Sequence, residues 1–224
     1  MPNLGSIVFV GCCLISCTGE RFNGGGASNN AAPSVAESTT NDAQPVRGAS
    51  PISAGPAPID GILFQECVGH PELPFVAELY PLPTNTSSLP NFASIKSIKT
   101  LCMEQLNITN RDFKSGFPGI EGLFEWFALS IRVNLKVPKD GDYTFTLKSD
   151  DGSRLFIQDE LIINNDGAHS AKSVSQIKTL KAGTYPARID YFQGPRFSIA
   201  LELKWQEPGA IEKVYIPSIY LQRP

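Results

Sequence analysis

Two acidic side chains stand next to each other in the segment SDDGSRLFI, at Asp150 and Asp151. Gly152 follows them, and then an alternation typical of a β-strand begins. Adjacent like charges repel, so the pair needs either solvent or a counter-charge. Carboxylate oxygens are ligands that Ca²⁺ prefers. The doublet is consistent with a cation site, and also with a hairpin corner at Asp151 and Gly152 in which Asp150 bonds to backbone N–H groups.

A second set of oxygen-bearing side chains, Asn164, Asn165 and Asp166, precedes Gly167. Similar residues bind calcium in EF-hand loops, but that pattern also needs a Glu further along the chain. We therefore interpret the segment as a turn held by its own Asn and Asp side chains. The lone His169 that follows is interpreted as a structural hydrogen-bonding group.

The sequence contains none of the common catalytic motifs. It has 2 histidines and lacks the G-x-S-x-G elbow, the H-E-x-x-H zinc pattern, the P-loop and the dinucleotide fingerprint. A glycoside hydrolase needs two carboxyl groups about 5–9.5 Å apart on either side of the scissile bond, and adjacent aspartates suit that task poorly. We predict that the protein is not an enzyme. Its net charge of -3 offers no basic surface for nucleic acid.

The elements that must position these residues are β-strands. Apolar and polar residues alternate strictly over 129–137, where five aliphatic side chains are separated by Ser, Arg, Asn and Lys. A Pro-Lys-Asp-Gly turn follows, and the alternation resumes over 143–147. The same pattern recurs at 155–157, 161–163, 185–191 and 199–205. Each strand has one polar face, which predicts an all-β, antiparallel β-sandwich over residues 60–224.

Further elements are expected near the two ends of this domain. We predict strands at 75–80 and 214–220, a short strand at 95–98, and a single short turn within 119–127. Trp205 closes an apolar stripe, and Trp126 has apolar neighbours, so we expect both indoles to be packed.

The N-terminal region has a different texture. Residues 7–15 are apolar but too few to span a bilayer. They end in Leu-Ile-Ser-Cys at Cys17, which resembles the lipobox of bacterial lipoproteins, although no Lys or Arg precedes the apolar core. This resemblance implies a signal peptide over 1–16, a lipid on Cys17 and a place in the cell envelope, at the outer membrane or cell surface of a bacterium. The alternatives are a secretory signal cut elsewhere or a buried segment.

Residues 17–59 are rich in Gly, Asn, Ala, Ser and Pro and contain few large apolar residues. Such a segment buries too little surface to offset its ordering entropy, so we predict a flexible tether.

The roles of the 5 cysteines can be assigned from the segments in which they lie. Cys12 and Cys13 fall in the removed signal, and Cys17 would carry the lipid. Cys67 and Cys102 remain, and outside the cytoplasm we predict that they form a disulfide. The alternative is two buried free thiols.

Several blocks, in order, resemble one domain family. Residues 137–145 (VPKDGDYTF), 147–157 (LKSDDGSRLFI) and 161–169 (LIINNDGAH) are similar to three of its blocks, and 183–185 (GTY) and 201–205 (LELKW) to its closing ones. The family is the N-terminal β-sandwich of anthrax protective antigen, also found in yeast flocculins and inserted in bacterial glycosidases. Several blocks in the correct order are more specific than any single motif.

The resemblance implies a sugar-binding or adhesive module. In the flocculins, a cis peptide joins the paired aspartates, which hold a calcium ion that binds sugar hydroxyls; the matching residues are Asp150 and Asp151. Flocculins add calcium ligands from a second loop, which here contains Gln193 and Arg196 and no carboxylate. Gln193 and Arg196 are candidate ligand-binding residues of this loop, and further calcium oxygens are expected from Gln193, backbone carbonyls, water, and the side chains of Asn164, Asn165 and Asp166.

Three functions are therefore open. The first is a membrane-tethered, calcium-assisted carbohydrate-binding module with glycans or glycosylated surfaces as partners. The alternative is a structural or protein-interaction module of the envelope without sugar binding. The third is a subunit that guides a separate glycan-processing enzyme.

Overall fold

The structure is a computed structural model that describes residues 64–112, 117, 119–120, 122 and 124–224. The predicted signal peptide, the lipid on Cys17 and the tether over 17–59 lie outside these residues and stay predictions. Within the described part, no helix is long and apolar enough to cross a bilayer.

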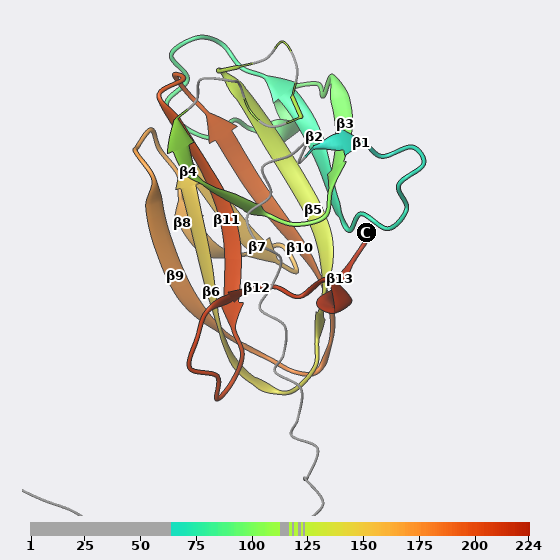
Figure 1. The fold of residues 1–224 in the computed structure, drawn as a ribbon. Helices are drawn as coiled ribbons and strands as arrows, with labels where there is room; N and C mark the ends of the chain where they lie inside the picture. Colours follow the sequence, from blue (N-terminus) through green and yellow to red (C-terminus); the bar gives the residue numbers. More distant parts are fainter. Residues whose placement is uncertain (1–63, 113–116, 118, 121, 123) are drawn as a thin grey trace, which may run out of the picture. The chain divides into compact units, whose positions relative to one another are not determined.

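Almost every regular element of the described residues is a β-strand (Figure 1). The strands are β1 (Gln65–Glu66), β2 (Phe75–Pro81), β3 (Lys99–Met103), β4 (Asn107–Asp112), β5 (Phe127–Val137), β6 (Gly141–Asp150), β7 (Ser153–Ile157), β8 (Glu160–Asn165), β9 (Lys172–Leu180), β10 (Gly183–Gln193), β11 (Ser198–Gln206), β12 (Val214–Tyr215) and β13 (Leu221–Gln222). Two short 3-10 turns, η1 (Phe92–Ser94) and η2 (Ser218–Tyr220), complete the set.

The strands form two antiparallel sheets. The larger sheet has the order β1-β3-β2-β5-β10-β7-β8, with β13 paired to β5. The smaller sheet has the order β12-β11-β6-β9, with β4 paired to β11. The two layers share one hydrophobic core, so the predicted all-β sandwich is confirmed.

The core follows from the alternation in the sequence. On β5 the odd-numbered side chains from Leu129 to Val137 are buried, whereas Arg132 and Lys136 point outward and are exposed. Trp205 on β11 is fully buried and lies 5.2 Å, centroid to centroid, from Tyr143 on β6. Burying one large apolar side chain contributes about 1.5–3 kcal/mol, so these rows hold the layers together. The prediction for Trp205 is confirmed.

Some predicted elements differ from the structure. Residues 95–98 are not a strand, and the pairing strand begins at Lys99. The predicted strand at 214–220 is two residues of β12 followed by η2. Trp126 is only half-buried, with a φ of 59°, because the chain turns there to enter β5.

The structure also contains four strands that the sequence did not indicate: β4, β9 and the two-residue strands β1 and β13. Strand β9 lies at the edge of the smaller sheet, and most of its side chains are exposed. An edge strand with little buried surface needs no apolar face, so the alternation that reveals other strands is absent.

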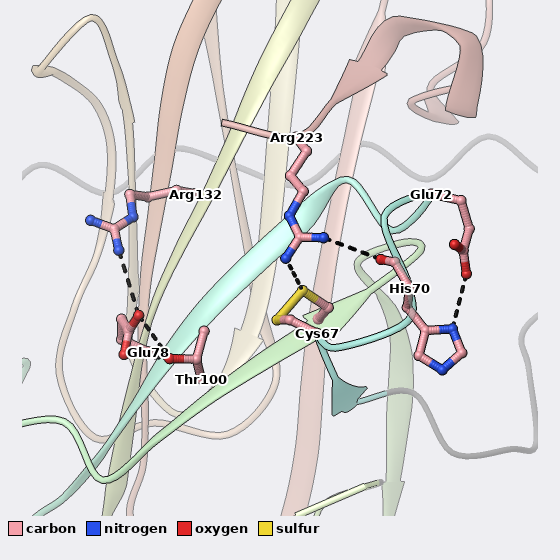
Figure 2. The surroundings of a disulfide bond; sticks show 8 residues. Cys67, His70, Glu72, Glu78, Thr100, Arg132 and Arg223 are labelled. Carbon is pink, nitrogen blue, oxygen red and sulfur yellow. Dashed lines mark hydrogen bonds and ion pairs between the residues drawn. A yellow bond between two sulfur atoms is a disulfide. The ribbon is translucent and has the colours of Figure 1, made fainter.

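The predicted disulfide is confirmed between Cys67 and Cys102, which is buried on β3 (Figure 2). Arg223, near the C-terminus, lies against this bond. Its guanidinium donates to the His70 carbonyl at 3.2 Å and points at the Cys102 sulfur at 3.5 Å. The disulfide and Arg223 together join the segment before β2 to the edge of the larger sheet.

Candidate functional site

The acidic doublet lies where the chain passes from one sheet to the other. Asp150 is the last residue of β6 in the smaller sheet, and Ser153 is the first residue of β7 in the larger one. Strands β6 and β7 do not pair with each other, so a hairpin corner at Asp151 and Gly152 is wrong. The peptide between Asp150 and Asp151 is cis, as the flocculin resemblance implied.

Hydrogen bonds close the crossover on both sides of the doublet. The hydroxyls of Ser149 and Ser153 lie 2.7 Å apart, and Asn165 donates to the Ser149 hydroxyl at 3.0 Å. All three side chains are buried. They hold the ends of β6, β7 and β8 together around the two carboxylates.

The Asp151 carboxylate accepts two backbone hydrogen bonds from different loops. Gly194 N–H donates to Oδ2 at 2.7 Å, and His169 N–H donates to Oδ1 at 3.2 Å. A Cβ at Gly194 would lie 2.9 Å from that same Oδ2, closer than real Cβ contacts. An alanine at 194 would therefore force the Asp151 carboxylate or the loop to shift.

Asp150 is held by three groups. Its carboxylate accepts from the Ser198 hydroxyl at 3.0 Å and from the Ala171 backbone. Its carbonyl accepts from the Tyr191 hydroxyl at 2.7 Å. Tyr191 is fully buried, and burial together with the nearby aspartates raises its pKa well above the usual range. It therefore stays a neutral donor.

Both carboxylates are buried without a matching cation. Asp150 and Asp151 are each 6 % exposed, and no described Lys or Arg forms an ion pair with either. Burial raises the pKa of both carboxyl groups, and the charge of Asp150 raises that of Asp151 further. Two buried negative charges are costly unless a cation compensates them.

His169 lies beside the doublet and is a structural hydrogen-bonding group, as predicted. Its Nδ1 and Nε2 each lie 2.9 Å from a backbone carbonyl oxygen, of Ser170 and Asn165. Burial is the main influence on the pKa of both neighbouring aspartates and raises it.

The second loop contains the two predicted ligand-binding residues in different environments. Gln193 is fully buried; its Oε1 lies 2.6 Å from the Tyr191 hydroxyl oxygen, and its Nε2 donates to two loop carbonyls at 3.4 Å. Arg196 is exposed, with its guanidinium 5.6 Å from the centre of the Phe124 ring. Gln193 therefore stabilises the loop, whereas the exposed Arg196 does not pair with the carboxylates of Asp150 and Asp151.

The predicted turn begins later than the sequence indicated, because Asn164 and Asn165 end strand β8 and the bend held by Asp166 follows at Gly167. The Asn164 side-chain oxygen accepts from Asp166 N–H at 3.2 Å. Asp166 accepts from Leu89 N–H at 2.8 Å and forms an ion pair with Arg154. Asn165 differs, because its buried Oδ1 has no hydrogen-bond partner. Of the three, Asn165 alone has a buried, unused oxygen.

The donor set fits a hard divalent cation. Within the described residues no three or more His, Cys, Asp or Glu side chains are placed to hold one metal ion, so the two aspartates would have to share a cation with oxygen ligands of other kinds. Ca²⁺ takes 6–8 oxygen ligands, which include carboxylates, backbone carbonyls and waters. Two buried carboxylates without a basic partner supply the charge that such an ion requires.

Sequence reasoning missed Gly194, Ser198 and Tyr191 as partners of the doublet. In the sequence, Tyr191 and Ser198 occupy regular positions of two predicted strands, and Gly194 lies in the turn between them, so nothing local marked them as partners of the doublet. Only the pairing of β11 with β6, which sets Ala200 opposite Asp150, brings their loop to the crossover.

Comparison with known proteins agrees with this architecture. The search of curated proteins found no match. Among solved structures, a PA14 sugar-binding domain from an RTX adhesin has a TM-score of 0.56 at 17% identity, covering 68% of this chain and 99% of that one. The epithelial adhesin 6 A domain from Candida glabrata, solved with Galb1-3GlcNAc, has a TM-score of 0.50 at 18% identity, covering 73% and 92%.

An anti-sigma factor domain-containing protein has a TM-score of 0.53 at 21% identity, and the match covers 68% of this chain. The present chain spans 49% of that protein's length. At these identities the likeness shows the fold alone. The sequence matches the PA14 domain family model over residues 118–218, which include the doublet and both of its partner loops.

Proposed function

We propose that the described domain is a carbohydrate-binding, adhesin-like module in which Asp150 and Asp151 hold Ca²⁺. The observation that carries this proposal is the burial of two adjacent carboxylates, each 6 % exposed, with no described Lys or Arg paired to them. The PA14 match and the similarity to a PA14 sugar-binding domain from an RTX adhesin support carbohydrate as the ligand class. We propose a binding module and not an enzyme.

Bound Ca²⁺ would supply a positive centre that accepts sugar hydroxyls as ligands. The chain's own residues fix the two carboxylates, through Gly194, His169 and Ser198, and Asn165 has a free oxygen nearby in the crossover network.

The rim of the same loop offers surface for a sugar. Phe197 is 80 % exposed and adjoins Ser198, whose hydroxyl bonds Asp150. Arg196 is exposed on its other side. An apolar ring face and a multi-donor guanidinium are both suited to a polyhydroxy ligand.

Calorimetric titration with CaCl₂ tests the cation. We expect saturable binding heat for the purified protein after chelator treatment. Asp150→Asn and Asp151→Asn should abolish it, and the matched control Asp142→Asn, an exposed aspartate on the same strand, should not. Absence of heat at millimolar Ca²⁺ would refute the cation site.

A glycan array with and without chelator tests the sugar. Binding should require Ca²⁺, and Phe197→Ala should weaken binding to the array without changing the calcium heat. Calcium heat without any glycan signal, together with a calcium-dependent melting temperature, would instead favour a structural role.

We also propose that a lipid on Cys17 holds the domain at a bacterial cell envelope. The support is the lipobox-like sequence before Cys17 and the low-complexity segment after it. Palmitate labelling of cells expressing the protein should mark the wild type and not Cys17→Ser. Equal labelling would refute the anchor.

A further inference from the structure

A hollow away from the acidic doublet lies on the outer face of the larger sheet. Its volume is about 510 Å³. The residues that matter for its chemistry are Asn91, Ser130, Arg154, Phe156, Arg188 and Asp190. None of them belongs to the acidic doublet or to the loops that bond to it.

The floor of the hollow is built from cross-strand rows on β5, β10 and β7. Asp190 pairs with Ser130 on one side and with Arg154 on the other. In the next row, Arg188 pairs with Phe156. Side chains at paired positions lie on the same face of a sheet, so the outward residues of three strands form one polar surface.

The wall of the hollow is the segment around η1, which is anchored to the sheet. Leu89 packs with Ala128 and Phe192, and its N–H donates to Asp166 at 2.8 Å. Asp166 in turn forms an ion pair with Arg154 in the floor. These contacts make the hollow a built feature and not a chance gap between loops.

The floor offers more hydrogen-bond donors than its own acceptors use. Each guanidinium has five N–H donors. The Nε atoms of Arg154 and Arg188 are buried without a hydrogen-bond partner. Arg188 Nε lies 3.3 Å from Asp190 Oδ1, at ion-pair distance but outside hydrogen-bonding geometry. These two Nε atoms have almost no exposed surface, so a ligand with acceptor oxygens would bond instead to the terminal guanidinium nitrogens of the partly exposed Arg154 and Arg188.

The Asp190 carboxylate provides the complementary group. It is 4 % exposed, accepts from the Ser130 hydroxyl at 3.1 Å, and has a second oxygen for a ligand hydroxyl. Arg188 stacks over the Phe156 ring at 4.1 Å, which fixes the plane of the guanidinium. A planar, fixed guanidinium matches a carboxylate with two parallel hydrogen bonds.

We propose that this hollow is a second ligand site, which binds a carboxylate-bearing sugar such as a free uronic acid or the uronate unit of an acidic glycan. The carboxylate contacts Arg154 and Arg188, and ring hydroxyls contact Asp190, Ser130 and Asn91. The site needs no calcium and does not depend on the proposed function of the doublet.

The test is calorimetry with D-galacturonate and with D-galactose, both in the presence of chelator. We expect galacturonate to bind at least tenfold more tightly than galactose, and its affinity to fall as salt rises. Arg188→Lys keeps the charge but loses the planar fork and should weaken galacturonate binding at least fivefold. Lys136→Gln, an exposed cation on the same face of β5, is the matched control and should change nothing.

Folding is checked by the melting temperature of each variant. Ala93→Trp, which narrows the hollow without touching a charge, should also abolish galacturonate binding. Asp150→Asn should leave it unchanged, so failure at one site is distinguishable from failure at the other. Equal affinity for both sugars, no binding of galacturonate, or retained affinity in Arg188→Lys and Ala93→Trp would overturn the proposal.

Discussion

Replacing Asp151 by asparagine removes one negative charge from the crossover while keeping nearly the same volume. Asparagine has a single acceptor oxygen, so either Gly194 N–H or His169 N–H loses its partner. An unpaired buried donor costs about 1–3 kcal/mol. Relief of the repulsion from Asp150, which raises the pKa of Asp151, opposes that cost. Without Ca²⁺ the two effects partly cancel, and the change in stability is small.

With Ca²⁺ the difference between wild type and variant becomes large. A ligand at 100 times its dissociation constant stabilises the folded state by about 2.7 kcal/mol. For a domain of this size, 1 kcal/mol corresponds to roughly 2–4 °C in melting temperature, so the wild type should gain about 5–11 °C. Asp151→Asn should lose most of this gain.

The assay is thermal unfolding with CaCl₂ and with chelator, for wild type, Asp151→Asn and the control Asp142→Asn. Comparing the calcium-induced shifts removes the direct effect of each substitution. An Asp151→Asn variant that keeps the wild-type calcium shift would refute our assignment of the ion to the doublet.

Three further outcomes are expected. In chelator, the raised pKa values of Asp150 and Asp151 make the folded state more stable at low pH: their contribution is fully present below about pH 3.8 and is lost as the pH rises through the folded-state pKa. The metal-free wild type should therefore lose stability over that pH window. Denaturant unfolding at several pH values should show this loss in the wild type and not in the Asp150→Asn/Asp151→Asn double variant. Gly194→Ala places a Cβ 2.9 Å from Asp151 Oδ2 and should cost about 1–3 kcal/mol in urea unfolding while weakening calcium binding; an unchanged midpoint would contradict the close approach. Replacing Cys67 and Cys102 by serine opens a loop with a sequence separation of 35 residues and should lower the free energy of unfolding by about 4 kcal/mol. A loss below about 1 kcal/mol would show that Arg223 and the strand pairing hold the segment before β2 in place without the disulfide.

The sequence predicts those strands whose two faces differ in polarity. Strand β5 has a buried row and an exposed row, so its alternation was unambiguous. Strand β9 has almost no buried row, and local patterning carried no signal for it. The half-buried Trp126 shows the same limit, because its apolar neighbours suggested packing that the turn into β5 prevents.

The site was predictable only in part. The cis peptide was expected only from the family resemblance, since two adjacent aspartates before a glycine favour a turn when taken alone. Gly194 and Ser198 became partners through the pairing of β11 with β6, which depends on contacts distant in sequence. The outer hollow depends on the register of β7 against β10, which no local pattern specifies.

The crossover between β6 and β7 belongs to both layers at once. A cation bound by its two carboxylates would therefore link the two sheets to each other, in addition to ordering a loop. Amide hydrogen exchange should then slow in β6 and β7 together when the site fills, and a pulling force on a bound ligand would be shared by both halves of the sandwich instead of peeling a single strand.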